Sequence, residues 1–577
     1  MEPIPYNTKG KIMQNKWWQK EVVYQIYPKS FNDTNHDGIG DIQGITEKIP
    51  YLESLGITMI WICPIYKSPM ADNGYDISDY YELNPQFGTM SDLEELIRKA
   101  KESKIKIMLD LVINHTSDEH PWFQDVLRHP KTSKYRNYYI LKQGIDGHVP
   151  TNWRSVFGGS VWEPLPGSEN EFYFHSFHVK QPDLNWENPQ VREELYSMVN
   201  TWLDKGIAGF RVDAITFIKK DQSFSNLPAD GVDGLSKCTK STRNQPGIEV
   251  FLHELNERTF AKYDCITVGE APGVPYEEYS DYIGEGGYFS MIFDFHYADL
   301  DVVSGSEWFK RVDWTVHDLK KLIFKSQREL QKAGWGAQFF ENHDQNRSIS
   351  KYIKEEQNQN VDAATMLGAL FFFLRGTPFI YQGQEIGMTN VTRRSIEEFD
   401  DISSIDQYYR AIKEGFSEME ALGFINQRSR DHSRTPFHWS GHTHAGFSDV
   451  NPWLGLNENY PFINVDNQEQ DDHSVLSFYK RMIHVRQTND CLIYGDIVPI
   501  LEGHPTIVAY KRVTRSDEIV CLYNFDSSTN EVKLNRNEYE CLLSNVTEDH
   551  NQSNELIYTL KPFQAIILQK KEAIKNE

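Results

Sequence analysis

An arginine and a carboxylate, Arg211 and Asp213, end the apolar stretch Gly209–Ala214. Side chains two positions apart on a strand lie on the same face, so these two should be neighbours. A neighbouring guanidinium keeps a carboxylate ionised at neutral pH, and a covalent nucleophile requires an ionised carboxylate. A simple ion pair at a strand end would show the same pattern. Gly209–Ala214 therefore predicts a nucleophile only if other predicted strands also end in acidic residues.

Several other apolar runs also end in polar groups. Lys106–His115 ends in Asn114 and His115, Cys265–Glu270 ends in a glutamate, and Ala337–Asp344 ends in His343 and Asp344. Five further runs, which bring the total to about eight predicted strands, are Val22–Tyr27, Met59–Ile65, Phe210–Ala214, Tyr288–Phe295 and Pro378–Glu385. Amphipathic helical patterns separate many of them, and this alternation predicts a closed (β/α)8 barrel of the α/β class. An active site of such a barrel lies at the carboxyl ends of the strands.

The alternation of predicted strands and helices is interrupted twice, and each interruption predicts a separate domain. Residues 115–185 are rich in aromatic residues, glycine and proline and are too long for a loop, so we expect an inserted subdomain after the third strand. From residue 488 to 577 short alternating runs predict an antiparallel β-sandwich domain. The barrel would then comprise residues 13–114 and 186–487.

The composition of the chain limits the kinds of partner that it can bind and the cellular compartment in which it can reside. The chain has 577 residues, 39% hydrophobic content and a formal charge of −24, which disfavours nucleic acid and anionic membranes as partners. We expect a cytoplasmic protein, because no signal peptide or apolar run of membrane-spanning length is apparent. Translation could start at Met1 or Met13. The six cysteines are scattered, which predicts buried thiols rather than disulfides or a metal site. A monomer is expected, with a homodimer as the alternative.

A polar segment after the first predicted strand has the spacing of a calcium-binding loop. Oxygen side chains recur at every second position and a glycine, Gly38, stands at the sixth. The bidentate glutamate expected at position 12 is missing, since Gly44 stands there. The spacing predicts a structural Ca²⁺, with Mg²⁺ as the alternative and a polar turn without an ion as the simpler reading. The expected ligands are Asp33, Asn35, Asp37, the Ile39 carbonyl and Asp41.

The strand ends resemble the four signature regions of the α-amylase family of glycoside hydrolases. These regions stand here as Asp110–His115, Gly209–Ala214, Val268–Glu270 and Glu341–Asp344. Gln181–Trp186 and Ser429–Phe437 resemble more narrowly the oligo-1,6-glucosidase branch. That branch also includes α-1,4-glucosidases, sucrose isomerases, dextran glucosidases and trehalose-6-phosphate hydrolases. The similarity extends from about Trp17 to Leu568.

The resemblance implies a retaining mechanism with three carboxylates. Asp213 would be the nucleophile, Glu270 the general acid/base, and Asp344 a third carboxylate that holds sugar hydroxyls. A retaining glycosidase needs one ionised and one protonated carboxyl group about 5 Å apart. Arg211 should keep Asp213 charged, whereas Glu270 should have a raised pKa because it follows an apolar strand and lies near other acids.

The resemblance also implies a closed pocket for one terminal glucose, hence an exo-acting enzyme. Tyr75 and Phe177 would form its apolar walls, although core packing is an alternative role for Phe177. The substrate-binding residues implied are Asp72, Tyr75, His115, Phe177, Gln181, Arg211, His343 and Arg430.

Linkage preference is the least determined property. Many α-1,6-acting members carry valine after the nucleophile, whereas this chain carries Ala214, so both maltose and isomaltose remain candidate substrates. The stretch Glu307–Asp313 lacks the arginine-rich motif of sucrose isomerases, and no clear cationic site for trehalose 6-phosphate is visible. A non-catalytic binding barrel is disfavoured, because all three carboxylates are present.

Overall fold

The predicted barrel is present. The computed structural model describes residues 15–303, 305–547 and 556–571, and the choice between Met1 and Met13 lies outside them. Eight parallel strands form a closed barrel in the order β1-β15-β14-β13-β12-β10-β5-β2. Each barrel strand therefore lies beside the barrel strand that comes before it along the chain. Their bounds are β1 Val23–Ile26, β2 Met59–Ile62, β5 Lys106–Leu111, β10 Gly209–Val212, β12 Ile266–Glu270, β13 Met291–Phe293, β14 Gly336–Gln338 and β15 Thr377–Tyr381.

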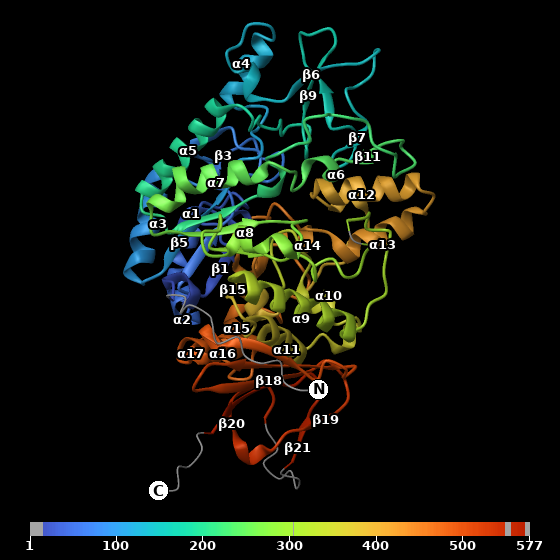
Figure 1. Ribbon diagram of the computed structural model, residues 1–577. Helices are drawn as coiled ribbons and strands as arrows, with labels where there is room; N and C mark the ends of the chain where they lie inside the picture. The colour runs from blue at the N-terminus through green and yellow to red at the C-terminus, as the bar shows by residue number, and fades with distance from the viewer. Residues whose placement is uncertain (1–14, 304, 548–555, 572–577) are drawn as a thin grey trace.

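Helices cover the outside of the barrel (Figure 1). Alternate strand residues serve two cores: on β2, Met59 and Trp61 belong to the barrel interior, while Ile60 and Ile62 pack beneath the helices. No helix within the described part of the chain is long and apolar enough to span a membrane. The helices between the strands are α1 Ile42–Glu47, α2 Ile49–Leu55, α3 Met90–Glu102, α5 Pro189–Asp204, α7 Ile248–Arg258, α8 Tyr279–Ile283, α9 Val316–Ala333, α11 Val361–Phe372 and, after β15, α16 Val475–Gln487.

Several predicted strands are longer than the observed ones, and this part of the prediction was wrong. β14 ends at Gln338, so Glu341–Asp344 lie in the loop beyond it, and Asn114 and His115 similarly follow β5. The apolar patterns continued past the last ladder hydrogen bonds because the loops themselves are buried under the insertion. The polar groups therefore lie on loops just above the carboxyl rim, where they can turn toward a common centre.

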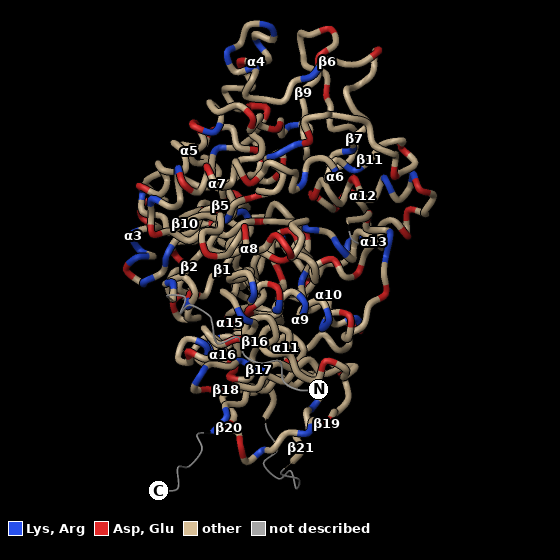
Figure 2. Tube along the Cα trace, viewed as in Figure 1, with Lys and Arg blue, Asp and Glu red and all other residues tan. Residues whose placement is uncertain are grey.

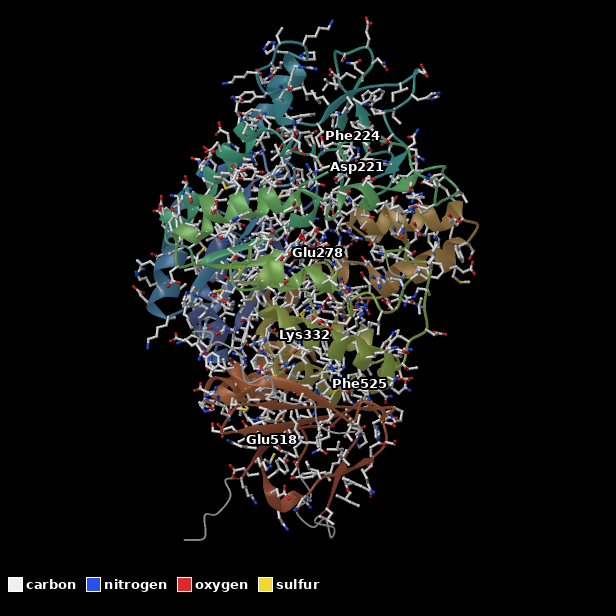
Figure 3. All side chains as sticks on the ribbon, in the orientation of Figure 1. Asp221, Phe224, Glu278, Lys332, Glu518 and Phe525 are labelled. Carbon is white, nitrogen blue, oxygen red and sulfur yellow. The ribbon has the colours of Figure 1, made fainter. Side chains whose placement is uncertain are left out.

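The inserted region forms the top of the molecule in Figure 1. It contains α4 Pro121–Arg128 and a sheet of β6 Leu141–Gln143, β9 Glu171–Phe174 and β8 Trp162–Pro164. A segment after β10 joins it, since β11 Ser236–Lys237 pairs with β7 Trp153–Arg154. Phe224 comes from the same segment and is labelled in the upper part of Figure 3. Its ring stacks on that of Trp153, with the ring centroids 5.6 Å apart. Two stretches far apart in sequence thus form one cap over the barrel.

The C-terminal strands form the opposite end of the molecule (Figure 1). β16 Asp496–Ile500, β17 Ile507–Val513, β18 Glu518–Asn524, β22 Ala565–Lys570 and β20 Tyr539–Ser544 make an antiparallel sheet. Alternate residues of β17 face different cores: Val508 and Tyr510 pack toward the barrel, whereas Ile507 and Ala509 pack toward a second, two-stranded sheet. That smaller sheet consists of β19 Asn530–Lys533 and β21 Ile557–Leu560. The predicted C-terminal β domain is confirmed.

Charged residues are spread over the whole molecule, and Figure 2 shows acidic residues in the insertion, in the barrel helices and in the C-terminal strands. Cys63, Cys238, Cys265, Cys491 and Cys521 are free thiols. Cys63, Cys238, Cys491 and Cys521 are buried, as expected, but Cys541 is exposed.

Candidate active site

A cavity of about 320 Å³ opens at the carboxyl end of the barrel, beneath the insertion. Most residues that the sequence singled out line it, namely Asp72, Tyr75, His115, Phe177, Asp213, Glu270, Asp344 and Arg430. The other three, Gln181, Arg211 and His343, are buried directly behind the cavity wall. Residues from seven separate stretches of sequence therefore converge on one cavity.

Arg211 is the centre of the carboxylate cluster. Its side chain is 2% exposed and its Nη1 donates to Asp213 Oδ1 at 2.7 Å and to Asp110 Oδ1 at 2.8 Å. Its Nη2 lies 2.9 Å from Glu270 Oε2. A single guanidinium thus holds the predicted nucleophile and the predicted acid/base side by side, because a planar fork can serve several carboxylate oxygens.

The charge state of this cluster is less simple than the sequence suggested. Burial raises the pKa of Asp213, Arg211 opposes that shift, and the nearby Glu270 and Asp110 reinforce it, so the pKa ends well above its usual range. The expectation that Arg211 keeps Asp213 charged was too simple, because one cation is shared among three carboxylates and does not by itself hold the pKa of Asp213 low.

Backbone geometry fixes which oxygens remain available. The N–H of Asp213 donates to the Leu111 carbonyl at 2.9 Å, which fixes the start of the loop against β5. The next residue, Ala214, is left-handed at φ 42°, and its N–H donates to Glu270 Oε2 at 2.7 Å. Oε2 thus accepts from two donors, which leaves Oε1 as the oxygen that can carry a proton.

Asp344 has a different environment from Asp213. Its Oδ1 lies 3.2 Å from Arg430 Nη1 and 3.0 Å from Arg434 Nη2, and its Oδ2 lies 3.0 Å from His343 Nε2. Burial alone would raise the pKa of Asp344, but these three cations hold it well below its usual range. Burial also opposes the charge of His343, yet Asp344 raises the pKa of that imidazole to about 10. Asp344 is therefore a fixed anion at neutral pH.

His343 does not reach the cavity; it supports residues that do. Its Nδ1 lies 2.8 Å from Gln25 Nε2, and its Nε2 lies 2.7 Å from the Tyr75 hydroxyl. The Tyr75 ring stacks on the imidazole at 5.2 Å, and its hydroxyl also donates to Asp110 Oδ2. Tyr75 links the Asp344 side of the cavity to the Arg211 side, in addition to forming a wall.

A second set of buried polar residues, Asp72, His115 and Gln181, lies in and directly behind the cavity wall. Gln181 Nε2 donates to Asp72 Oδ2 at 3.1 Å, and His115 Nε2 lies 3.0 Å from the Tyr75 carbonyl oxygen. Burial lowers the pKa of His115 to about 4, so this imidazole is neutral at physiological pH. Burial raises the pKa of Asp72, against the opposing effect of Arg430.

Aromatic side chains make the remaining wall. Phe177 lies at the predicted place, with its ring centroid 5.0 Å from that of Phe217 and 5.8 Å from that of Phe157. Ala214, the residue after the predicted nucleophile, also lines the cavity. The other lining residues were not predicted as site residues, because no recognised motif contains them. They are Val156, Phe157, Phe217, Thr239, Arg243, Pro272, Asp299, Trp308, Gln345, Asn346, Ser403 and Arg428.

A salt-bridge network holds the rim of the cavity next to Trp308. Glu307, 3% exposed, lies 2.5 Å from Arg410 of α12 Ile402–Lys413 and 2.9 Å from Lys310. It also lies 3.4 Å from Lys237 of β11 and 3.8 Å from Arg154 of β7. One carboxylate thus ties the loop after β13 to the insertion and to α12.

Replacing Glu307 with glutamine should destabilise the protein by about 2 kcal/mol, because several partly buried cations lose their common partner. Burial opposes ionisation, but these cations lower the pKa of Glu307 to about 2. The stabilisation that ionised Glu307 gives to the folded protein is therefore complete above the ordinary carboxyl pKa and is lost as pH falls toward 2. Urea unfolding at pH 7 and pH 4 measures the effect, and the difference from the native chain should shrink at the lower pH.

Glu82→Gln provides a matched control for Glu307→Gln. Glu82 forms an exposed pair with Lys67, and its loss should change stability by less than about 0.5 kcal/mol. Equal effects of the two substitutions would contradict the role assigned to the Glu307 network.

Comparison with known proteins agrees with this geometry. Residues 25–495 match the family model described as "Alpha amylase, catalytic domain". The chain is 44% identical to the probable oligo-1,6-glucosidase 3 of Bacillus subtilis (strain 168), an alignment that covers 96% of this chain and 99% of that protein.

Solved structures are similar over the same extent. The crystal structure of trehalose-6-phosphate hydrolase from Bacillus licheniformis has a TM-score of 0.87 and 39% identity, with 96% of this chain and 100% of that chain covered. The isomaltulose synthase from Protaminobacter rubrum has a TM-score of 0.91 and 36% identity, with 97% and 100% covered. The barrel, its carboxylate cluster and these matches together show that the chain belongs to the α-amylase family of glycoside hydrolases.

Proposed function

We propose that this chain is an exo-acting, retaining α-glucosidase that removes the terminal non-reducing glucose from short α-linked oligosaccharides. The observation that carries the proposal is the contact of one buried guanidinium, that of Arg211, with both Asp213 and Glu270. Such close carboxyl groups suit the separation of about 5 Å that retaining glycosidases use, whereas inverting enzymes need room for a water between them.

In the first step, Asp213 Oδ attacks the anomeric carbon while the bond to the glycosidic oxygen breaks. Glu270 gives its proton to that oxygen, so the leaving sugar departs as an alcohol and a glucosyl ester of Asp213 forms. In the second step, the Glu270 carboxylate takes a proton from water as the water oxygen attacks the same carbon, and the ester bond breaks. Glucose leaves with its original anomeric configuration.

Asp344 supports both steps by binding sugar hydroxyls. Because Arg430, Arg434 and His343 keep it anionic, it can accept hydrogen bonds from the hydroxyls and stabilise positive charge that develops on the ring. Tyr75 and Phe177 offer flat apolar surfaces to the sugar. The family resemblance implies that Asp72, His115 and Gln181 help to form a closed pocket for one terminal glucose, and the proposed exo action rests on that resemblance.

We propose that isomaltose is the better of the two disaccharide substrates. The relatives named oligo-1,6-glucosidase support this choice, and the alanine at position 214 does not argue against it on structural grounds. The backbone there is left-handed, a conformation that a β-branched valine adopts only with strain. The initial rate of glucose release from isomaltose should exceed that from maltose under the same conditions. A ratio well below one would identify an α-1,4-glucosidase and would leave Ala214 as a determinant of linkage.

A bound Ca²⁺ remains a proposal for the loop at residues 33–41. Asp33 Oδ2 accepts from the Gly38 N–H at 2.9 Å, and Asp37 Oδ1 accepts from the Ile39 N–H at 2.9 Å, so the side chains are folded inward as in a metal loop. No three His, Cys, Asp or Glu side chains of the described residues gather closely enough to hold a metal alone. The ion would therefore also need the Asn35 amide oxygen and the Ile39 carbonyl, with Asp33, Asp37 and Asp41.

Removal of Ca²⁺ should lower the unfolding temperature without changing the catalytic residues. Thermal unfolding with EDTA, and again after Ca²⁺ is restored, measures the effect, and Asp37→Ala should abolish it. A protein that unfolds at the same temperature with and without EDTA carries no structural Ca²⁺. Mg²⁺ in place of Ca²⁺ distinguishes the two ions.

We also propose a cytoplasmic location. The buried free thiols of Cys63, Cys238, Cys491 and Cys521 support it, because disulfides are rare in that compartment.

A further inference from the structure

A buried aspartate beyond the last barrel strand contacts one of the arginines that line the cavity. Asp401 immediately precedes α12 and is fully buried. It caps the helix, because its side chain accepts from the backbone N–H groups of Ser403 at 3.0 Å and Ser404 at 3.2 Å. Aspartate is favoured at this position, since its carboxylate satisfies N–H groups that the first helical turn leaves without partners. Helix capping therefore explains some contacts of Asp401, but not its contact with an arginine.

The guanidinium of Arg430 is held more tightly by Asp401 than by the carboxylates of the cavity. Its Nε donates to Asp401 Oδ1 at 2.8 Å, and its Nη2 lies 2.7 Å from the same oxygen. By contrast, Nη1 lies 3.2 Å from Asp344 Oδ1, and Nη2 lies 3.5 Å from Asp72 Oδ1. Charge-assisted hydrogen bonds between nitrogen and oxygen are normally about 2.7–2.9 Å long. Only the contacts with Asp401 have that length.

The surroundings of Asp401 make it a fixed, ionised anchor. Burial opposes its charge, but Arg430 and Arg434 lower its pKa. The backbone N–H of Asp401 donates to Asp431 Oδ2 at 3.1 Å, and the Ser404 hydroxyl donates to Asp401 Oδ2 at 2.7 Å. Both the backbone and the carboxylate of Asp401 are thus held in place, so the arginine that they bind has a defined position.

Loss of this anchor would change the contacts of the two cavity carboxylates. A buried guanidinium without its main partner turns toward the remaining carboxylates, because an unpaired buried charge is costly. For Arg430 these are Asp344 and Asp72. Carboxylate oxygens that pair closely with Arg430 accept hydrogen bonds from sugar hydroxyls less readily. The terminal glucose would then have to displace the arginine before it could bind.

We propose that Asp401 is a positioning residue, which holds Arg430 back from Asp344 and Asp72 and so leaves these two carboxylates available to the terminal glucose. Asp401 acts through Arg430 rather than by touching the sugar. The proposal rests on the α-glucosidase function proposed above. It gives α12 a part in sugar binding, since this helix also pairs with Glu307 at the cavity rim through Arg410.

Asp401→Ser and Asp401→Asn test the proposal, because serine and asparagine also cap helices but lack the charge that holds Arg430. Calorimetric titration with glucose should give a dissociation constant at least about tenfold higher for both variants than for the native enzyme. With p-nitrophenyl α-glucoside, KM should rise by a similar factor while kcat changes by less than about threefold, since the arginine is displaced in the ground state and in the transition state alike. Asn489→Ser, a change at the start of α17 Asp490–Tyr494, is the matched control and should leave glucose binding intact.

Arg430→Met separates positioning from a purely structural role. In that background Asp401→Ser should have no further effect on glucose affinity, because the arginine that it would release is absent. A role of Asp401 in folding alone would give the same loss with or without the arginine. Unfolding temperatures show whether each variant is folded. Two results would overturn the proposal: a glucose affinity of both Asp401 variants within about twofold of the native value, or a loss that persists in the Arg430→Met background.

A crystal structure of Asp401→Ser tests the position of Arg430 independently of turnover and of glucose binding. The guanidinium should lie within about 2.9 Å of Asp344 or Asp72 in that variant. An unmoved guanidinium would overturn the proposal. A native chain that binds no glucose and releases no p-nitrophenol would contradict the α-glucosidase function, and the variant structure would still decide whether Asp401 positions the arginine.

Discussion

Replacing Asp213 with asparagine should lower kcat by about four powers of ten or more, because the amide cannot form the glucosyl ester. The fold should survive, since asparagine has nearly the same shape and can still accept a hydrogen bond from Arg211. Hydrolysis of p-nitrophenyl α-glucoside measures the loss, and circular dichroism confirms the fold. Near-normal activity would contradict the assignment of the nucleophile.

Azide distinguishes the nucleophile from the acid/base. With Asp213→Gly, azide can enter the vacated space, attack the anomeric carbon directly and give a β-glucosyl azide. With Glu270→Ala, the ester on Asp213 still forms from a substrate with a good leaving group, and azide then displaces it to give an α-glucosyl azide. Azide products of the same configuration from both variants would contradict the assigned roles.

Replacing Arg211 with methionine should destabilise the protein by about 3–5 kcal/mol, because three carboxylates would lose their shared counter-charge in a buried site. Burial already raises the pKa of Asp213, and loss of the guanidinium would raise it further. A carboxyl group whose pKa is raised in the folded state destabilises the fold at high pH, and this destabilisation disappears as pH falls below that pKa. Chemical unfolding should therefore show the largest loss near pH 8 and a smaller loss near pH 5.

The exposed pair of Arg258 and Glu193 provides the matched control for Arg211→Met. Arg258→Met removes an arginine that contacts both oxygens of a glutamate, yet it should cost much less stability than Arg211→Met because solvent screens the pair. A loss of similar size for both variants, or a loss at Arg211 that does not change with pH, would contradict the shared-cation account.

The barrel and the centre of the site were predictable because each depends on local patterns. Short apolar runs that alternate with amphipathic helices are enough to predict the eight barrel strands, though not where each one ends, and polar residues at the predicted strand ends indicated where the carboxylates would gather. The family resemblance then supplied roles for Asp213, Glu270 and Asp344. These roles stay predictions until the variants are measured.

The rest of the site depends on contacts between distant segments, which carry no local signal. The Glu307 network joins the insertion, the loop after β13 and α12. No sequence pattern in any one of these three segments predicts that they contact one another. The same holds for Arg434 beside Asp344 and for Asp110 behind Arg211. The expected ionisation of Asp213 was too simple for the same reason. Asp110 also pairs with Arg211, and this contact is apparent only in the folded chain.

The measurement that tests the central claim most directly is the anomeric form of the first glucose released. Proton NMR during the first minutes of p-nitrophenyl α-glucoside hydrolysis, before mutarotation mixes the anomers, resolves the two forms, and this substrate releases only one glucose per cleavage. The account predicts α-glucose, because two displacements at the same carbon restore its configuration. Release of β-glucose would show a single displacement by water and would contradict the roles assigned to Asp213 and Glu270.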